Sequence, residues 1–530
     1  MLKNLSLIIN CNQVFIRHNE KDVNNNIQVM NELFDAISNV YIPLLDMFEN
    51  LEKDNILCRV GFVLSPVLCN LLSNNEVQDL YVNYLDTRIA FGNDELLRCK
   101  GQQALEKNIQ TTIERYQKLK IEFLEKYNQN LISVFKNYMH KGYIELLATC
   151  ATDIFIPHYA DMKEVISAQI ECGLNSFKQY FGEIPEGFWL PELGYIDGLE
   201  KIIKAYGFSY TIVDSRSLLL AKKIPSTGIF YPVRADNSLV FFGQEPNCHD
   251  EIYGEGGFVN SPFYRNENKD VGFELEPENL KSIWTNEASR VETGFKYWNR
   301  NYRDADKSIY DQDTAKKQAQ DDAVYFIQKK EEKLNKAAEL MKDYDFVCLV
   351  STIDAYELSQ EWFEGVYWLE CLIRRANKSD INLTSPSDML ENQYSLEKIN
   401  PYFSSSNGEG YGENLLSSKN CWMMRYIRKA CERMVDLADR FPTDTGLKTR
   451  LLNIGSVELM IAQSSSLAKM IDCNDNPEYA ERRFKDSIEA FTQVFDSLGS
   501  NTVSTEWLTS LEAKDSLFPW MNYRVFSKKK

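Results

Sequence analysis

The sequence predicts an α/β fold built on a parallel sheet or barrel, followed by a separate helical region. Short apolar runs alternate with helical patterns over roughly the first 400 residues, as is expected where strands are buried on both faces of a parallel sheet. Further along the chain these runs stop, and apolar residues recur only at helical spacing. The 530 residues also exceed the usual length of one domain, so we expect several structural units.

Seven apolar runs are predicted strands. The first is LSLIIN at 5–10, and the others lie at 56–65, 142–151, 187–191, 208–214, 238–243 and 346–352. Helical patterns separate several of them, for example at 164–182 and 199–207, and each of these two ends at a glycine. Strands that alternate with helices favour a parallel sheet or barrel.

Two regions depart from this alternation. Residues 70–140 contain long helical stretches, which predict a helical insertion inside a barrel domain that spans residues 1–400. Residues 401–526 contain amphipathic helical patterns, the clearest of which lie at 421–441, 446–471 and 477–499. We therefore expect an all-helical C-terminal domain.

The charge balance limits the classes of partner. With 59 basic and 77 acidic residues the net charge is −18, so the chain should repel nucleic-acid phosphates and anionic lipid. A neutral polymer such as a glucan meets no such barrier. No apolar run reaches the length of about 18 residues that a membrane span needs. We expect neither nucleic acid nor a membrane as a partner.

Cysteine and histidine usage gives no sign of a metal or disulfide framework. The twelve cysteines form no CxxC pair, and the four histidines show no HxH or HxxxH spacing. The N-terminal segment has only a short apolar stretch, broken at Asn10, and lacks a small-residue cleavage site. These features predict a cytoplasmic protein with free thiols.

Two carboxylates stand where a barrel carries its reactive groups. Glu192 follows the predicted strand GFWLP, and Asp354 follows FVCLVST. The carboxyl ends of parallel strands form the active-site face of a barrel. Glycoside transfer needs one carboxylate at the anomeric carbon and a second, protonated one that donates to the leaving oxygen. Position alone leaves helix-capping or surface roles open, because the chain has 77 acids.

The string GFWLPELGY at 187–195 resembles the third motif of glycoside hydrolase family 57, in which the glutamate is the nucleophile of a retaining mechanism. This implies that role for Glu192. The string DAYELSQEWFEG at 354–365 is similar to the segment that carries the family's acid/base aspartate, which implies that role for Asp354. Three later segments resemble the C-terminal region of the family's α-1,4-glucan branching enzymes: 404–422, 461–484 and 517–526. The resemblance implies a distorted or incomplete (β/α)7 barrel.

Several positions differ from the family pattern. Asn10 and Asn12 stand at the two histidines of the first motif, and Asp153 stands at the histidine that ends the second. Gln244 replaces an arginine, and Gln360 replaces a histidine of the fourth motif. Amide side chains can bond to sugar hydroxyls, but they cannot carry a proton as an imidazole does. We treat these five residues as candidate substrate-binding groups.

Aromatic side chains are the other candidate sugar contacts. Trp189 and Trp362 have flat faces that can stack on a sugar ring, although a tryptophan beside a strand end is as often part of the core. Two further tryptophans of the family pattern are absent, with Asn407 and Leu467 in their places. The expected sugar-contacting shell is therefore altered around the two carboxylates.

The predicted reaction is a double displacement on an α-1,4-glucan. Glu192 attacks the anomeric carbon, Asp354 protonates the leaving oxygen, and an acceptor hydroxyl or water then takes the glycosyl unit. Transfer to a 6-hydroxyl makes a branch, whereas transfer to water is hydrolysis. No metal or organic cofactor is required. Two alternatives stay open, namely a non-catalytic glucan-binding or regulatory homologue and a glycosidase with a changed glycan specificity. The oligomeric state is left open.

Overall fold

Seven parallel strands form the centre of the computed structural model, which describes residues 1–17, 27–283, 290–301, 308–390 and 393–528. Each strand overlaps one of the seven runs predicted from the sequence. They are β1 (Leu2–Cys11), β2 (Val60–Leu64), β3 (Ile144–Leu146), β4 (Gly187–Phe188), β5 (Tyr210–Val213), β7 (Val240–Gly243) and β8 (Phe346–Asp354).

The strands close into a barrel with two weak seams. One sheet has the order β3-β2-β1-β8, and the other contains β4-β5-β7. Single parallel bridges join them, from Ala148 to Phe188 and from Gln244 to Val350. The resulting order, β1-β2-β3-β4-β5-β7-β8, confirms the distorted (β/α)7 barrel. Two short strands lie outside this path, β6 (Val233–Arg234), antiparallel to β7, and β9 (Ile381–Leu383), beside β1.

The strand residues alternate between the barrel interior and the surrounding helices. Along β1, Ile8 belongs to an interior cluster, while Leu7 and Ile9 pack in the main core against helices. The same interior cluster takes residues from the other strands or from the positions directly after them, including Val63, Leu147, Ile212, Phe242 and Val350. A barrel filled in this way is a packed core, so any binding site has to lie at the strand ends.

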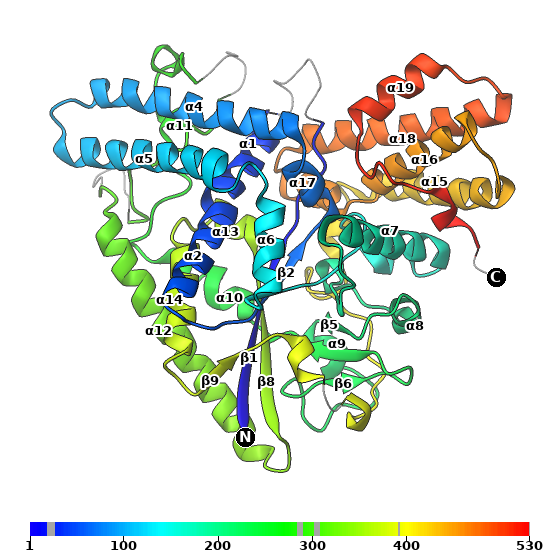
Figure 1. Cartoon of the computed structure of the whole chain (residues 1–530), viewed down its shortest axis with the longest axis horizontal. Helices are drawn as coiled ribbons and strands as arrows, with labels where there is room; N and C mark the ends of the chain where they lie inside the picture. Colours follow the sequence, from blue (N-terminus) through cyan, green and yellow to red (C-terminus); the bar gives the residue numbers. More distant parts are fainter. Residues whose placement is uncertain (18–26, 284–289, 302–307, 391–392, 529–530) are drawn as a thin grey trace.

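Helices connect and cover the strands. The barrel helices are α1 (Ile27–Ala36), α2 (Ile42–Lys53), α7 (Lys163–Phe181), α8 (Leu199–Ala205), α9 (Ser215–Leu219), α10 (Cys248–Tyr253), α11 (Val271–Glu274), α12 (Gln312–Leu340), α13 (Ala355–Gln360) and α14 (Gly365–Ala376). A single π-helical turn, Ile37–Tyr41, joins α1 to α2. In Figure 1, β1 and β8 run side by side with α12 alongside them.

The connection between β2 and β3 is a helical insertion. It contains α3 (Pro66–Leu72), α4 (Asn75–Arg98), α5 (Gln103–Ile121) and α6 (Leu131–His140). The side chain of Asn74 begins α4 by accepting hydrogen bonds from the Glu76 and Val77 amides. Figure 1 shows α4 and α5 lying next to each other as a long hairpin.

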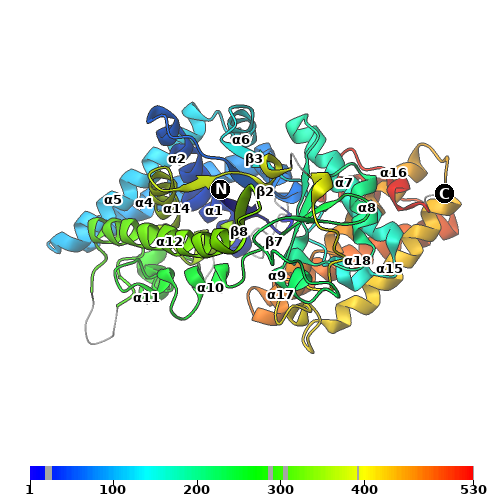
Figure 2. The same ribbon diagram turned by 90° about the horizontal axis from the view of Figure 1, so that it is seen from below.

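The C-terminal helices lie on the other side of the barrel from this hairpin (Figures 1 and 2). They are α15 (Cys421–Arg440), α16 (Leu447–Ala462), α17 (Ser465–Cys473), α18 (Pro477–Ser500) and α19 (Thr505–Lys514). Arg483 of α18 joins them through buried ion pairs with Glu458, at 2.9 Å, and Asp515, at 3.1 Å. Arg17 also pairs with Asp515, at 2.5 Å, which fixes the segment after β1 to the helical region.

The structure thus contains the predicted helical insertion and the all-helical C-terminal domain. The exact boundary near residue 400 stays a prediction. None of the helices in the described ranges combines the length and the apolar character needed to cross a bilayer.

Candidate active site

Glu192 sits in a turn directly after β4. Residues Pro191–Leu193 form one turn of 3-10 helix, and Glu192 itself has φ 52° and ψ 22°, in the left-handed region. A residue with a side chain rarely takes this conformation, and such strain is concentrated at functional sites. The amide of Ser406 donates to the Glu192 carbonyl oxygen at 2.8 Å. A second segment of the chain therefore holds this turn in place.

The Glu192 side chain faces an open pocket of about 370 Å³ at the strand ends. Asn407 lies beside it and donates from Nδ2 to the Glu192 Oε2 atom at 3.3 Å. The pocket wall includes four of the predicted substrate-binding residues, namely Asn10, Asn12, Asp153 and Trp189. The structure thus gathers side chains from β1, the loop after β3 and the end of β4 around one carboxylate.

Asp354 ends β8 and begins α13. Its Oδ1 atom accepts from the Tyr356 amide at 2.9 Å, and its Oδ2 atom accepts from Asn10 Nδ2 at 3.1 Å. Asn10 and Asp354 are direct partners in the β1–β8 register, so the barrel itself fixes this contact. Burial raises the pKa of Asp354 to about 6, and the neighbouring charge of Glu357 adds to the rise. A carboxyl group with this pKa can hold a proton near neutral pH, as a general acid must.

Lys469 brings a positive charge from the helical region to both carboxylates. It lies on α17, and its side chain is exposed to solvent. The charge of Glu192 is the largest cause that raises the pKa of Lys469, and the charges of Asp354 and Glu357 also raise it. The Lys469 charge in turn opposes the rise in the pKa of Asp354. The candidate site is therefore completed by the C-terminal helices.

Asp153 joins the barrel to the first turn of α17. Its carboxylate accepts from the Ser464 hydroxyl at 2.5 Å and from the Ser466 amide at 2.7 Å. Asn12 donates to the Ser466 hydroxyl at 3.3 Å. A carboxylate at a helix N-terminus is stabilised by the free amides there. Asp153 thus lines the pocket wall and also anchors the helix that carries Lys469.

The two tryptophans occupy different environments. Trp189 lines the pocket, although only 6% of it is exposed, and Thr149 donates to its carbonyl oxygen at 3.0 Å. Trp362 is 1% exposed and packs against Tyr264 and Trp368, with ring centroids 5.4 and 5.1 Å away. Trp362 is therefore a core residue, which corrects the sugar-stacking interpretation, because its faces are covered by other rings.

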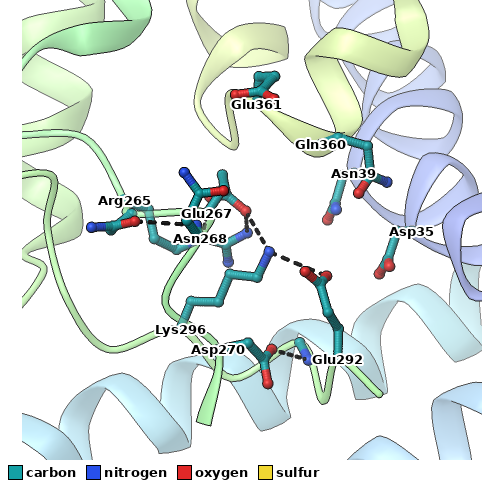
Figure 3. A network of polar contacts seen from close by, with 12 residues as sticks. Asp35, Asn39, Arg265, Glu267, Asn268, Asp270, Glu292, Lys296, Gln360 and Glu361 are labelled. Carbon is teal, nitrogen blue, oxygen red and sulfur yellow. Dashed lines mark hydrogen bonds and ion pairs between the residues drawn. The ribbon is translucent and has the colours of Figure 1, made fainter. Parts of the chain in front are cut away.

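The two glutamines do not line the pocket around Glu192. Gln244 lies at the seam between β7 and β8, where Nε2 donates to the Thr352 hydroxyl at 2.5 Å. Gln360 ends α13 and lines another cavity, together with Asp35 and Asn39 (Figure 3). Within the described ranges the structure thus separates Gln360 from the two carboxylates, because the short helix α13 carries it away from Asp354.

A sequence comparison decides the family. The model described as "Glycosyl hydrolase family 57" matches residues 14–401, which contain every barrel strand except β1, together with Glu192 and Asp354. The chain belongs to glycosyl hydrolase family 57. A second model, described as "1,4-alpha-glucan branching enzyme, C-terminal", matches residues 426–526, which run from within α15 to beyond α19.

Individual relatives and solved structures agree with this assignment. The chain is 24% identical over 480 residues to the 1,4-α-glucan branching enzyme TK1436 of Thermococcus kodakarensis, covering 85% of this chain and 68% of that one. The solved structure of the α-amylase AmyC of Thermotoga maritima has 28% identity and a TM-score of 0.90, with all of both chains covered. A family 57 branching enzyme from Pyrococcus horikoshii shares the fold, at 21% identity and a TM-score of 0.88, over 100% of this chain and 98% of that one.

Two site residues of this family 57 chain were missed by the sequence reasoning. Lys469 lies in the segment 461–484, which resembles the family's C-terminal region, but no spacing rule shows that α17 faces the barrel. Asn407 was noted only as the loss of a tryptophan, whereas its amide contacts Glu192. As to metals, the described residues contain no group of three His, Cys, Asp or Glu side chains that could hold an ion.

Proposed function

We propose that this family 57 chain is a retaining enzyme that transfers segments of α-1,4-glucan and forms branches. One observation carries the proposal: Glu192 and Asp354 stand at the carboxyl ends of two strands of one barrel, and both interact with the charge of Lys469. Paired carboxylates of which one holds a proton are the groups that glycosyl transfer requires.

The first half of the reaction breaks the glucan chain. A carboxylate oxygen of Glu192 attacks the anomeric carbon, while Asp354 donates its proton to the departing glycosidic oxygen. The product is a glycosyl ester on Glu192 and a released chain end. Asn407 holds the Oε2 atom of Glu192, which leaves the other oxygen available for the attack.

The second half transfers the glycosyl unit. Asp354, now a carboxylate, removes the proton from a 6-hydroxyl of an acceptor chain as that oxygen attacks the same carbon. The ester bond to Glu192 breaks, Asp354 regains its proton, and the product carries a new branch. Two displacements at one carbon retain its configuration.

The C-terminal helices and the relatives support branching over other transfers. The match over residues 426–526 is to the C-terminal region of branching enzymes. In this chain the matched range contains α17, which carries Lys469, and the following helix α18. The curated relative from Thermococcus kodakarensis is itself named a branching enzyme. We further propose a cytoplasmic location, because the twelve cysteines are free thiols, as is usual in a reducing compartment.

Hydrolysis is the second candidate function. The α-amylase of Thermotoga maritima covers this chain completely and has the higher identity of the two solved structures compared, at 28%. Water would then replace the 6-hydroxyl in the second displacement. The catalytic groups would be the same, so only the acceptor differs.

Incubation with amylose separates the candidates. Branching lowers the iodine absorbance and creates chains that a debranching enzyme releases, with few new reducing ends. Hydrolysis creates new reducing ends without branches. We expect branching by the wild type, and a loss of at least about a thousandfold in E192Q and D354N. E186Q, which changes an exposed glutamate six residues earlier, is the matched control and should keep full activity. A wild type that binds glucan without changing it would contradict the proposal.

A further inference from the structure

Helix α10 is anchored along β8 by two buried contacts. The Cys248 thiol lies 3.9 Å from the hydroxyl of Thr352, which stands two residues before Asp354 on β8. Glu251 pairs with Lys330 of α12 at 2.6 Å, and the Lys330 side chain is fully buried. Buried polar contacts whose groups are paired restrict the movement of the elements that they join. The residues between the two anchors are therefore held beside the end of β8.

His249 lies between these anchors and contacts helix α13. Its Nε2 atom is 2.9 Å from Glu357 Oε1, which makes an ion pair when the ring is protonated. Glu357 stands in the first turn of α13, and Asp354 is the N-cap of the same helix. Side chains at the N-cap and at the third helical position lie next to each other. Glu357 thus links His249 to Asp354.

The carboxylate of Glu357 favours the protonated form of Asp354. Burial is the main cause that raises the pKa of Asp354 to about 6, and the charge of Glu357 is the next. Like charges in one helical turn repel each other, so ionisation of Asp354 costs more while Glu357 is charged. A general acid has to hold its proton near the working pH. Glu357 therefore supports the acid role of Asp354.

His249 keeps a positive charge over the pH range in which Asp354 titrates. The hydrogen bond to Glu357 raises the pKa of His249 to about 9, and Asp250, 3.5 Å from the Nδ1 atom, adds to the rise. The pKa of Asp354 is lower, at about 6, so the ring is still charged when Asp354 loses its proton. A cation beside Glu357 opposes the repulsion between Glu357 and Asp354.

Other titratable groups surround these residues. Lys469 faces Asp354 and Glu357 from α17. Glu361, which follows α13, adds a negative charge near one of the tyrosines. Burial raises the pKa of three further neighbours, so they stay uncharged near neutral pH: Cys11, Tyr41 and Tyr253. The cations among these described neighbours are Lys469 and His249, and they reach the carboxylates from different helices.

We propose that His249 and Glu357 are a pair of positioning residues for Asp354, with Glu357 facing it from the same helical turn and His249 holding the Glu357 carboxylate. The charge of Glu357 keeps the proton on Asp354, and the charge of His249 limits this effect. The acid/base role of Asp354 rests on the proposed function, whereas the coupling among the three charges rests on their contacts.

The pH profile of kcat on amylose tests the pair through its effect on Asp354. In E357Q the basic limb should move to lower pH by about half a pH unit or more, because a neighbouring negative charge is lost. In H249Q it should move to higher pH by roughly 0.3 pH unit, because a more distant positive charge is lost. H249Q should have a smaller effect in the E357Q background, where the ring lacks the partner that keeps it charged.

Two further variants separate charge from structure. H249K keeps a positive charge at this position and should restore the basic limb of the wild type. H140Q changes another exposed histidine that pairs with a glutamate, since His140 lies 3.4 Å from Glu183, and it should leave the profile unchanged. A basic limb that does not move in E357Q would overturn the proposal, as would an H249Q shift that is equally large with and without Glu357.

Urea unfolding at pH 7.5 tests the same coupling without turnover, on variants that thermal unfolding has first shown to be folded. The gain in the free energy of unfolding that D354N brings should be smaller in the E357Q background and larger in the H249Q background. Equal gains in all three backgrounds would overturn the proposal. Unequal gains of the expected sign in a chain that does not convert amylose remove only the proposed function. Branching with an unmoved basic limb in E357Q removes only the pair.

Discussion

Asn407 Nδ2 donates a hydrogen bond to the Oε2 atom of Glu192 at 3.3 Å. An ionised carboxylate can only accept, so the amide nitrogen of Asn407 has to face it. Asn407 is 6% exposed, and the neighbouring Ser406 amide holds the Glu192 backbone. The segment that contains Ser406 and Asn407, where the family has a tryptophan at position 407, thus holds both the backbone and the side chain of the candidate nucleophile.

Replacing Asn407 should therefore reduce turnover more than substrate binding. We expect N407A to lower kcat by about tenfold, because a hydrogen bond to a charged group is worth about 1.5 kcal/mol or more. N407D should lower it further, because a carboxylate at position 407 cannot donate to Glu192 and repels its charge. Initial rates on amylose measure both effects. N414A, an exposed asparagine of the same loop, is the control, and equal kcat in N407A and N414A would contradict the expectation.

Asn10 should set the upper pH limit of activity through Asp354. Its Nδ2 atom donates to Asp354 Oδ2 at 3.1 Å, which favours the charged form and lowers the pKa of Asp354. In N10A that pKa should rise above its value of about 6, so the basic limb should move up by roughly half a pH unit or more. N12A is the comparison, because Asn12 bonds to Ser466 and should leave this limb in place. A basic limb that moves to lower pH in N10A would contradict this expectation.

Lys469 should act on Asp354 through its charge. Its positive charge opposes the rise in the pKa of Asp354. In K469Q Asp354 should hold its proton to higher pH, so the basic limb of the kcat profile should move upward. K485Q removes an exposed lysine of α18 that pairs with Glu481, and it should leave the profile unchanged. The interpretation of Lys469 fails if the two variants have the same pH profile.

Asp354 should lower the stability of the fold at neutral pH. Its pKa is about 6 in the folded chain and about 4 in an unfolded chain, so stability falls as the pH rises from 4 through 6. D354N removes this loss and should raise the free energy of unfolding by about 2 kcal/mol at pH 7.5, with no gain at pH 4 or below. Urea unfolding at the two pH values measures the difference. A variant that is destabilised equally at both would show that the charge of Asp354 is well accommodated.

Much of the barrel could be predicted because buried parallel strands leave a simple pattern. The runs at 5–10 and 346–352 are continuous and apolar, and they form β1 and β8 side by side. Placing Glu192 and Asp354 at the strand ends followed from the same pattern. The two seams at Ala148 and Gln244 left no sequence signal, because a single bridge needs no particular residue.

The rest of the site depends on contacts between distant segments. Lys469 lies more than a hundred residues beyond Asp354, and only the packing of α17 against the barrel brings them together. Trp362 matched the family string but is covered by Tyr264 and Trp368. Gln360 matched the same string and lies in a separate cavity, since the direction of a side chain after a short helix cannot be read from a motif.

Trapping of the glycosyl intermediate tests the central claim, that Glu192 is the nucleophile. Incubation of D354N with α-maltosyl fluoride, whose fluoride leaves without a proton, should give a covalent adduct because the second step then lacks its base. Peptide mass spectrometry should place one maltosyl unit on the peptide that contains Glu192, and none should form in the double variant E192Q/D354N. An adduct on another residue, or release of fluoride by E192Q/D354N at the rate of D354N, would contradict the claim.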